Sequence, residues 1–216
     1  MKKLFSIMRM LSSSRYLVRR LQTHYIVEET RGQSYSVVID VGAGTSPYRK
    51  MIKHERYIVV DIEDRGGADG AERVTGDLTK GIPLENELAD LILCTEVLEH
   101  VPEYSVAMSE LHRLLKPGGV LLVTVPFVWV LHEAPNDFFR FTHFGIQHLL
   151  EGVGFSKVVV INSNNYFYTL LQLAVIPLRH PIFVPTVFLL NVLGYVVGLC
   201  GPSATLPLNQ HVRAEK

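Results

Sequence analysis

Three acidic residues stand at or just after the ends of successive hydrophobic runs in the first half of the chain. Asp40 is followed by Gly42 and Gly44, and Asp61 and Asp77 come at the next two run ends. Ligands bind at the carboxyl ends of parallel strands in α/β sheets, so these carboxylates are expected to face one site. The glycines would let backbone N–H groups approach a ligand, and a strand-end carboxylate can accept both hydroxyls of a ribose.

Other interpretations of this pattern stay open. The glycine turn alone also fits a tight structural turn without a ligand, and Asp61 also fits a solvated strand end. A dinucleotide fingerprint, Gly-x-Gly-x-x-Gly, would need glycine where Pro47 stands. The chain also has no Tyr-x-x-x-Lys pair, and both features disfavour a nicotinamide-dependent oxidoreductase.

The elements that would position these residues alternate between β-rich runs and helical stretches. Strands are predicted at residues 35–41, 57–61, 91–95, 120–125 and 157–161. Their continuous Val, Ile and Leu runs suit strands covered on both faces of a parallel sheet. Helices are predicted at residues 48–54, 104–115 and 142–151, the second stopped by Pro117 and Gly118. This alternation predicts a doubly wound α/β domain.

A polar loop after the fifth predicted strand is the candidate catalytic segment. It carries His132, Glu133, Asp137 and Arg140 among four aromatic residues, Phe127, Trp129, Phe138 and Phe139, which predicts polar groups set in an aromatic pocket. His132 is the preferred general base because its unperturbed pKa lies near neutrality, and Glu133 or Asp137 could serve instead. In the structural alternative, Arg140 pairs with Asp137 or Glu133 and braces the loop.

We expect no metal site from the sequence. The motif His-Glu-x-x-His would need a second histidine where Asn136 stands, and no spacing of cysteine and histidine suggests zinc.

Taken together, these motifs resemble the class I S-adenosylmethionine-dependent methyltransferases, most closely their type-11 branch. The resemblance covers about residues 36–161 and rests on four segments: residues 40–44 with Asp61, residues 76–78, residues 94–101 and residues 114–119. It implies a seven-stranded Rossmann-like sheet and S-adenosylmethionine as the cofactor. It also implies that Glu99 and His100 organise the turn after the fourth strand and the wall of the cofactor site.

The resemblance assigns ten residues to the cofactor. They are Asp40, Gly42, Ala43, Gly44, Asp61, Ile62, Asp77, Leu78, Thr95 and Glu96. It implies that Asp40 lies near the ammonium group of the cofactor, Asp61 at the ribose and Asp77 at the adenine. Ser46 stands where the family often has a third glycine, which predicts a changed backbone angle in the turn.

Residues 132–140 are similar to a segment of methyltransferases linked to bacterial glycan and cell-surface biosynthesis. That similarity implies O-methylation of a saccharide or lipid-linked glycan. A small hydrophobic or lipid acceptor is an alternative, as is a catalytically silent, membrane-docked scaffold. Lys and Arg together equal Asp and Glu, 21 each, which argues against a nucleic-acid partner. Two cysteines exclude a disulfide framework and indicate a cytoplasmic chain, near the inner face of the membrane if it contacts one.

Four zones are predicted along the chain: a basic amphipathic segment at 1–30, the cofactor-binding core at 31–162, an apolar zone at 163–204, and a tail or last strand at 205–216. The first zone would pack on the core or rest on anionic lipid. The apolar helical insertion has three interpretations: a membrane-spanning helix, short helices in or partway into the membrane interface, or a soluble lid or dimer interface.

Overall fold

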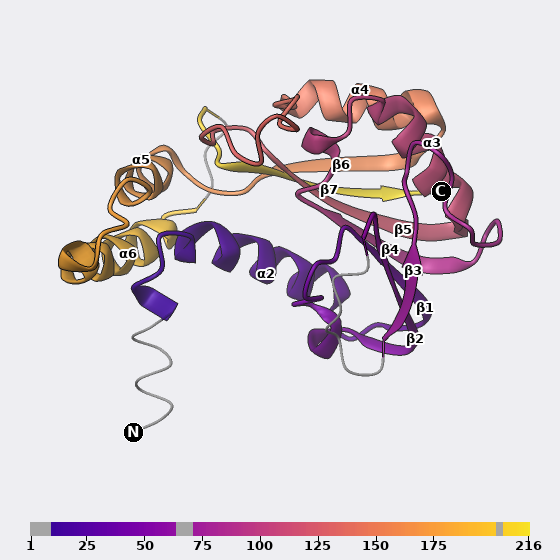
Figure 1. Cartoon of the computed structure of the whole chain (residues 1–216), viewed down its shortest axis with the longest axis horizontal. Coiled ribbons are helices and arrows are strands. Elements are labelled where there is room, and N and C mark those ends of the chain that lie inside the picture. Colours follow the sequence, from indigo (N-terminus) through magenta and orange to yellow (C-terminus); the bar gives the residue numbers. More distant parts are fainter. Residues whose placement is uncertain (1–9, 64–70, 202–204) are drawn as a thin grey trace.

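The computed structural model describes residues 10–63, 71–201 and 205–216, and it contains one mixed sheet of seven strands in the order β3-β2-β1-β4-β5-β7-β6 (Figure 1). The strands are β1 Ser34–Val41, β2 Lys53–Asp61, β3 Glu72–Thr75, β4 Ala89–Thr95, β5 Leu115–Pro126, β6 Ser156–Asn162 and β7 Asn209–Glu215. The helices are α2 Tyr16–Thr30, α3 Tyr104–Leu114, α4 His143–Val153, α5 Tyr166–Val175 and α6 Val184–Gly198, with 3-10 turns η1 Arg49–Met51, η2 Leu98–His100 and η3 Pro181–Phe183. The predicted doubly wound, seven-stranded α/β fold is confirmed.

Parts of three predicted zones fall outside this description. They are residues 1–9 of the basic segment, residues 64–70 of the cofactor-binding core and residues 202–204 of the apolar zone.

The first five strands are parallel, and their carboxyl ends meet at one edge. β1 lies between β2 and β4, and Val41 at its end is opposite Val60 and Cys94. The end of β2 pairs with the end of β3, and the end of β4 pairs with β5. Loops that leave these strand ends are therefore held side by side, which is the arrangement a ligand site in such a sheet needs.

The last strand, β7, runs antiparallel between β5 and β6. Val212 pairs with Val123 on one side and with Val160 on the other. The sequence of β7 is polar and gives only a weak strand signal, yet Val212 and Ala214 are fully buried. Both neighbouring strands supply backbone hydrogen bonds, and this tertiary pairing outweighs the weak local β-propensity.

Helices cover both faces of the sheet (Figure 1). α3 and α4 lie on one face, where Leu111 and Ile146 belong to the larger buried cluster. α2 lies on the other face, where Tyr25 and Ile26 pack in a second cluster with Val38 of β1. The amino-terminal segment is thus packed on the core, as one of its two predicted interpretations requires.

The helix predicted at residues 48–54 is wrong. Only the single turn η1 forms there, and β2 begins at Lys53, which pairs with Ser34 at the start of β1. The long register with β1 takes residues 53–57 into the sheet, so tertiary pairing overrides the local helix signal that Pro47 suggested.

α5 and α6 form an apolar hairpin beside the start of α2, away from the sheet (Figure 1). Asn191, fully buried in the middle of α6, donates hydrogen bonds to the backbone oxygens of Leu11 at 2.6 Å and Ser13 at 3.0 Å. Gly194 lies against Leu17, whose side chain would be 2.6 Å from a Cβ at that position. One face of α6 is therefore fixed to the amino-terminal segment.

The other face of this hairpin is apolar and exposed. Among the described residues, Pro181–Gly198 is the one helical stretch long and apolar enough to cross a membrane, by length and composition only, and 17% of it is buried. The large hydrophobic side chains exposed on α5, on α6 and on the residues that flank α6 are Tyr166, Phe167, Leu170, Ile182, Phe183, Val184, Leu189, Val192, Leu193, Tyr195, Val196 and Leu199. Of these, Tyr195 lies under the guanidinium of Arg20 in α2.

Candidate active site

The turn after β1 is built for close backbone approach. Gly42 has φ +65°, and a Cβ there would be 2.3 Å from Cγ2 of Val97. Gly44 has φ +51°, with no described atom within 4 Å of a Cβ built on it. Ser46 adopts φ +49°, the left-handed region that a third glycine would occupy without strain. Ser46 thus keeps the left-handed backbone of a glycine, and the changed backbone angle predicted for it is not observed.

Asp40, which lies just before this turn, has a buried carboxyl group of which only one oxygen accepts a hydrogen bond from the described residues. The hydroxyl of Tyr57 donates to Oδ2 at 2.7 Å, while Oδ1 has no hydrogen-bond partner among the described residues. Burial raises the pKa of Asp40 to about 7; the bond from Tyr57 opposes this rise and the nearby charge of Asp61 adds to it. A buried, half-satisfied carboxyl of this kind is suited to a cationic partner.

Asp61 and Asp77 lie at the same edge of the sheet. Asp61 ends β2, its Oδ1 accepts the N–H of Ile62, and the Ile62 side chain is exposed. Asp77 follows β3, and both its oxygens accept bonds, from Thr79 and from Lys80 at 2.8 Å, which lower its pKa to about 2. Both oxygens of Asp77 thus have protein partners, although the Lys80 side chain is 80% exposed and can be displaced.

Glu96 follows Thr95 at the end of β4 and turns into the protein rather than toward solvent. Its Oε1 accepts hydrogen bonds from Thr124 Oγ1 at 2.8 Å and from Asn209 Nδ2 at 2.7 Å. Burial raises its pKa to about 7, and these bonds oppose the rise. Its φ of +55° is uncommon for a residue with a side chain, and such strain is concentrated at functional sites.

Glu96 also lines a cavity of about 180 Å³ between α2 and the ends of the central strands. The cavity is lined by Arg15, Val18, Arg19, Gln22, Glu96, His100, Trp129, His132 and Glu133. The sequence predicts His132, Glu133 and Trp129 here and misses the α2 residues, whose helical spacing gives no sign of where that helix docks. Through Glu96 the cavity reaches the end of β4, the strand next to β1 in the sheet.

The loop above the cavity is held by a buried ion pair. Asp137, whose side chain is 1% exposed, accepts Arg140 Nη1 at 2.6 Å and Nη2 at 2.7 Å. This pair holds the pKa of Asp137 far below its usual range, and the carboxylate also accepts the N–H and ring Nδ1–H of His132. The structure therefore favours the bracing alternative for Asp137, since so stabilised a carboxylate is a poor proton acceptor.

The aromatic pocket predicted around the loop forms only in part. Trp129 lines the cavity, but Phe139 packs against Tyr104 at a ring-centroid distance of 5.0 Å, on the side of the larger core. Phe138 is 44% exposed. The backbone N–H groups of both phenylalanines donate to the carbonyl of Glu99, which ties the loop to η2 and directs their rings away.

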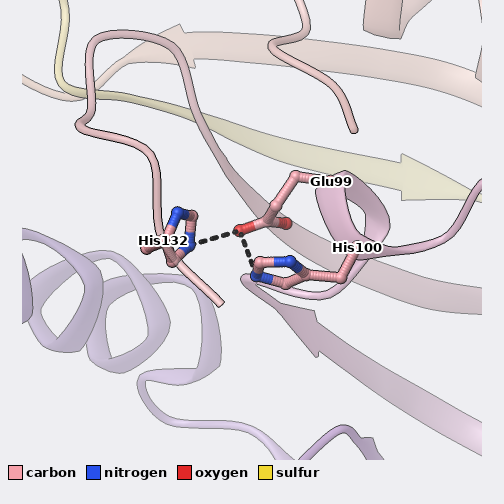
Figure 2. Close-up of side chains that lie close together, drawn as sticks. All are labelled: Glu99, His100 and His132. Atoms are coloured by element: carbon pink, nitrogen blue, oxygen red, sulfur yellow. Dashed lines mark ion pairs between the residues drawn. The ribbon is translucent and has the colours of Figure 1, made fainter. Parts of the chain in front are cut away.

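Figure 2 shows that Glu99, His100 and His132 converge although η2 and the loop are far apart in sequence. Nε2 of His100 is 3.7 Å and Nε2 of His132 is 4.0 Å from Oε1 of Glu99. Glu99 is fully buried, and neither carboxylate oxygen has a hydrogen-bond partner in the described part of the chain. Burial raises the pKa of Glu99 to about 9, and the charge of Glu96 adds to the rise.

The α/β sheet and the side chains at the carboxyl ends of its parallel strands indicate the kind of ligand that the protein binds. An open α/β sheet with a glycine turn after β1 and carboxylates at successive strand ends binds an adenosine-containing ligand at that edge. The unsatisfied Oδ1 of Asp40, the open space at Gly44 and the half-buried carboxylate of Asp61 fit the ammonium group, the backbone approach and the ribose of S-adenosylmethionine.

Comparison with known proteins shows similarity to methyltransferases. A family model described as a methyltransferase domain matches residues 39–123, from β1 through β5. A solved phosphoethanolamine N-methyltransferase 2 from Haemonchus contortus, in complex with S-adenosyl-L-methionine, superposes with a TM-score of 0.62 at 17% identity over 90% of this chain and 52% of that one. Residues 39–123 thus match a methyltransferase domain, the fold is that of S-adenosylmethionine-dependent methyltransferases, and both findings support S-adenosylmethionine as the cofactor.

Curated relatives match over part of their length. Methyltransferase AacuQ of Aspergillus aculeatus is 34% identical over 101 residues, 42% of this chain and 32% of that protein. A ubiquinone biosynthesis O-methyltransferase of Pseudomonas paraeruginosa is 26% identical over 138 residues, 58% of this chain and 56% of the relative. The chain thus spans between about a third and three fifths of these and similar relatives.

We expect Asp40 to make the binding of S-adenosylmethionine pH-dependent. Its pKa near 7 means that it is partly protonated at neutral pH, whereas a bound ammonium group favours the carboxylate. Below pH 7 binding must therefore release a proton, and affinity is expected to fall about tenfold per pH unit. Calorimetry between pH 5.5 and 8.5 measures this slope, and Asp40→Asn should flatten it. An unchanged slope in that variant would remove Asp40 from the cofactor site.

Proposed function

We propose that this chain transfers a methyl group from S-adenosylmethionine to an oxygen of a saccharide or lipid-linked glycan, in the cytoplasm at the inner face of a membrane. The cavity lined by Glu96 and His132 carries this proposal, because it joins the cofactor edge to a polar loop. Its volume of about 180 Å³ suits the reacting end of an acceptor rather than a whole glycan. An O-methyltransferase among the relatives supports oxygen as the methylated atom.

The chain has two tasks in such a reaction. When bound, the cofactor supplies a methyl group on a sulfonium, which is already strongly activated. The protein then aligns the acceptor, which can contribute roughly 7–11 kcal/mol in well-oriented systems. It must also accept the hydroxyl proton, and His132 fits this role because Asp137 takes its Nδ1–H and leaves the Nε2 lone pair directed into the site. Glu133, which lines the same cavity, is the alternative proton acceptor.

Arginines around the cavity favour an acceptor with negative charge. Arg15 and Arg19 line it, and Arg15 also lines a neighbouring hollow together with Arg179 and His132. All three arginines are exposed at the surface. Guanidinium groups bind phosphate in a bidentate geometry, so a phosphate-bearing lipid or sugar acceptor matches this mouth better than a neutral sugar does.

The apolar hairpin supports contact with a membrane in the plane of its surface. The middle of α6 is bonded through Asn191 to Leu11 and Ser13, so a spanning α6 would take that polar segment into the bilayer centre. An in-plane orientation buries the exposed face of α5 and α6 while the arginines near the cavity meet anionic headgroups.

Binding and transfer assays test the proposed function separately. Calorimetry should detect binding of S-adenosylmethionine and none of NAD. Incubation with methyl-labelled cofactor and membrane lipid extracts should then place label in a glycan or glycolipid fraction, as a methyl ether identified by mass spectrometry. Cofactor binding without transfer to any such fraction would favour the silent scaffold, and label on nitrogen or carbon would overturn the oxygen assignment.

Membrane association has its own test. Leu189→Asp and Val196→Asp change exposed positions on α6 and should each reduce co-sedimentation with phosphatidylglycerol-containing vesicles several-fold, because a carboxylate at the interface opposes insertion. Val106→Asp, at an equally exposed position on α3, is the matched control and should bind like the wild type. Wild-type chain that stays in the supernatant at low salt would contradict membrane contact.

A further inference from the structure

We propose that Glu99, His100 and His132 form a binding site for a divalent transition-metal ion, in the class of Zn²⁺ and Co²⁺, which opens toward the acceptor cavity. One carboxylate oxygen and two ring nitrogens lie within 4.8 Å of one another, contributed by η2 and by the loop after β5 (Figure 2). Two imidazoles and a carboxylate are a common ligand set for such ions, with a further position open for water or substrate.

Hydrogen bonds fix both imidazoles in the form that binds metal. Nδ1 of His100 lies 2.6 Å from the backbone oxygen of Asn136, and since a carbonyl can only accept, this nitrogen carries the proton. Nδ1 of His132 lies 3.1 Å from the carboxylate of Asp137 and donates in the same way. In each ring the unprotonated Nε2 then faces Glu99. Metal-binding histidines are oriented by partners of this kind.

The unpaired carboxylate of Glu99 is the second observation. It is fully buried, and neither oxygen has a hydrogen-bond partner among the described residues. Two nitrogen lone pairs and a carboxylate oxygen directed at one point repel one another when Glu99 is ionised, and a cation between them removes that repulsion. The separations of 3.7 and 4.0 Å are too long for a shared proton, whereas an ion with bonds of about 2.0–2.1 Å holds its donors about 3.3 Å apart.

The site is close enough to the acceptor cavity to matter for catalysis. His100, His132 and Glu133 line that cavity, and the side chains of the two histidines are 16% and 18% exposed. This part of the inference rests on the proposed function. An ion with an open position toward the cavity would bind the acceptor hydroxyl and lower its pKa. The oxygen then attacks the methyl carbon, the carbon–sulfur bond breaks, and the hydroxyl proton passes to Glu133 and solvent.

Metal binding is measured without any assay of methyl transfer. The metal-stripped full chain, in a Cys200→Ser background that removes the exposed thiol, is titrated with Zn²⁺ by calorimetry and with Co²⁺ by visible absorption. We expect one ion per chain. Glu99→Gln keeps the shape of the side chain and should weaken binding at least tenfold, as should His132→Gln. His148→Gln, on the exposed face of α4, is the matched control and should leave binding unchanged.

The outcomes separate this inference from the proposed function. Failure of the wild type to bind either ion, or equal binding by Glu99→Gln, overturns the metal site even if methyl transfer is found. Stoichiometric binding lost in Glu99→Gln and His132→Gln supports the site even if no acceptor is methylated. Circular dichroism and S-adenosylmethionine binding identify any variant that has merely failed to fold, and Glu99→Asp, which keeps the charge, should then recover part of the affinity.

Discussion

Gly42→Ala is expected to abolish measurable binding of S-adenosylmethionine and to lower the free energy of unfolding by about 2–4 kcal/mol. Two effects add in this variant. Alanine is disfavoured at φ +65°, and its Cβ would lie 2.3 Å from Cγ2 of Val97, which must move. Val97 precedes η2, so its displacement also disturbs the turn that follows β4. Urea unfolding measures the stability and calorimetry the affinity.

Gly44→Ala is the matched control for this prediction. Gly44 shares the left-handed backbone, with φ +51°, but no described atom lies within 4 Å of a Cβ at that position. Its loss of stability should therefore be limited to the backbone term, about 1 kcal/mol. Its affinity for the cofactor should still fall, because the new Cβ projects into the open space of the turn. Wild-type stability and affinity in Gly42→Ala would contradict both the close contact and the cofactor role of the turn.

His132→Ala is expected to lower turnover by about 10²–10³-fold while the affinity for S-adenosylmethionine changes less than about threefold. His132 lines the acceptor cavity and lies on the loop after β5, whereas Asp40, Asp61 and Asp77 lie at or after the ends of β1, β2 and β3. Its loss removes either a proton acceptor or a metal ligand, and both serve the transfer step. Single-turnover kinetics and cofactor calorimetry on the same preparation measure the two quantities.

Two variants control for the integrity of the loop. Asp137→Asn weakens the Arg140 pair and the orientation of His132, so an intermediate loss of turnover is expected, with KM also raised. His148→Gln alters an exposed histidine of α4 and should retain wild-type turnover. Full activity in His132→Ala would remove this residue from the mechanism and leave Glu133 as the proton acceptor.

Local sequence patterns were sufficient for the elements that position the cofactor. The hydrophobic runs that end at Val41, Asp61 and Thr95 became neighbouring parallel strands, because Val and Ile runs of that length are stable only when both faces are covered. The glycine turn and each acid directly follow a predicted strand, so the parallel arrangement of those strands placed them at one edge. A local signal failed at residues 48–54, where the register with β1 drew the segment into β2.

The remaining features depend on contacts between segments that are distant in sequence. The sequence of α2 predicts only a basic amphipathic helix, yet the packing of this helix on the sheet brings Arg15 and Arg19 to the acceptor cavity. Helix α3 and strand β5 separate Glu99 from His132 in the sequence, and each residue alone has an ordinary structural explanation. The amino-acid sequence thus determined the sheet and the edge at which the glycine turn and the strand-end acids meet. Only the tertiary structure decided which side chains meet above that edge, because their meeting depends on how the loop and α2 pack and not on any local pattern.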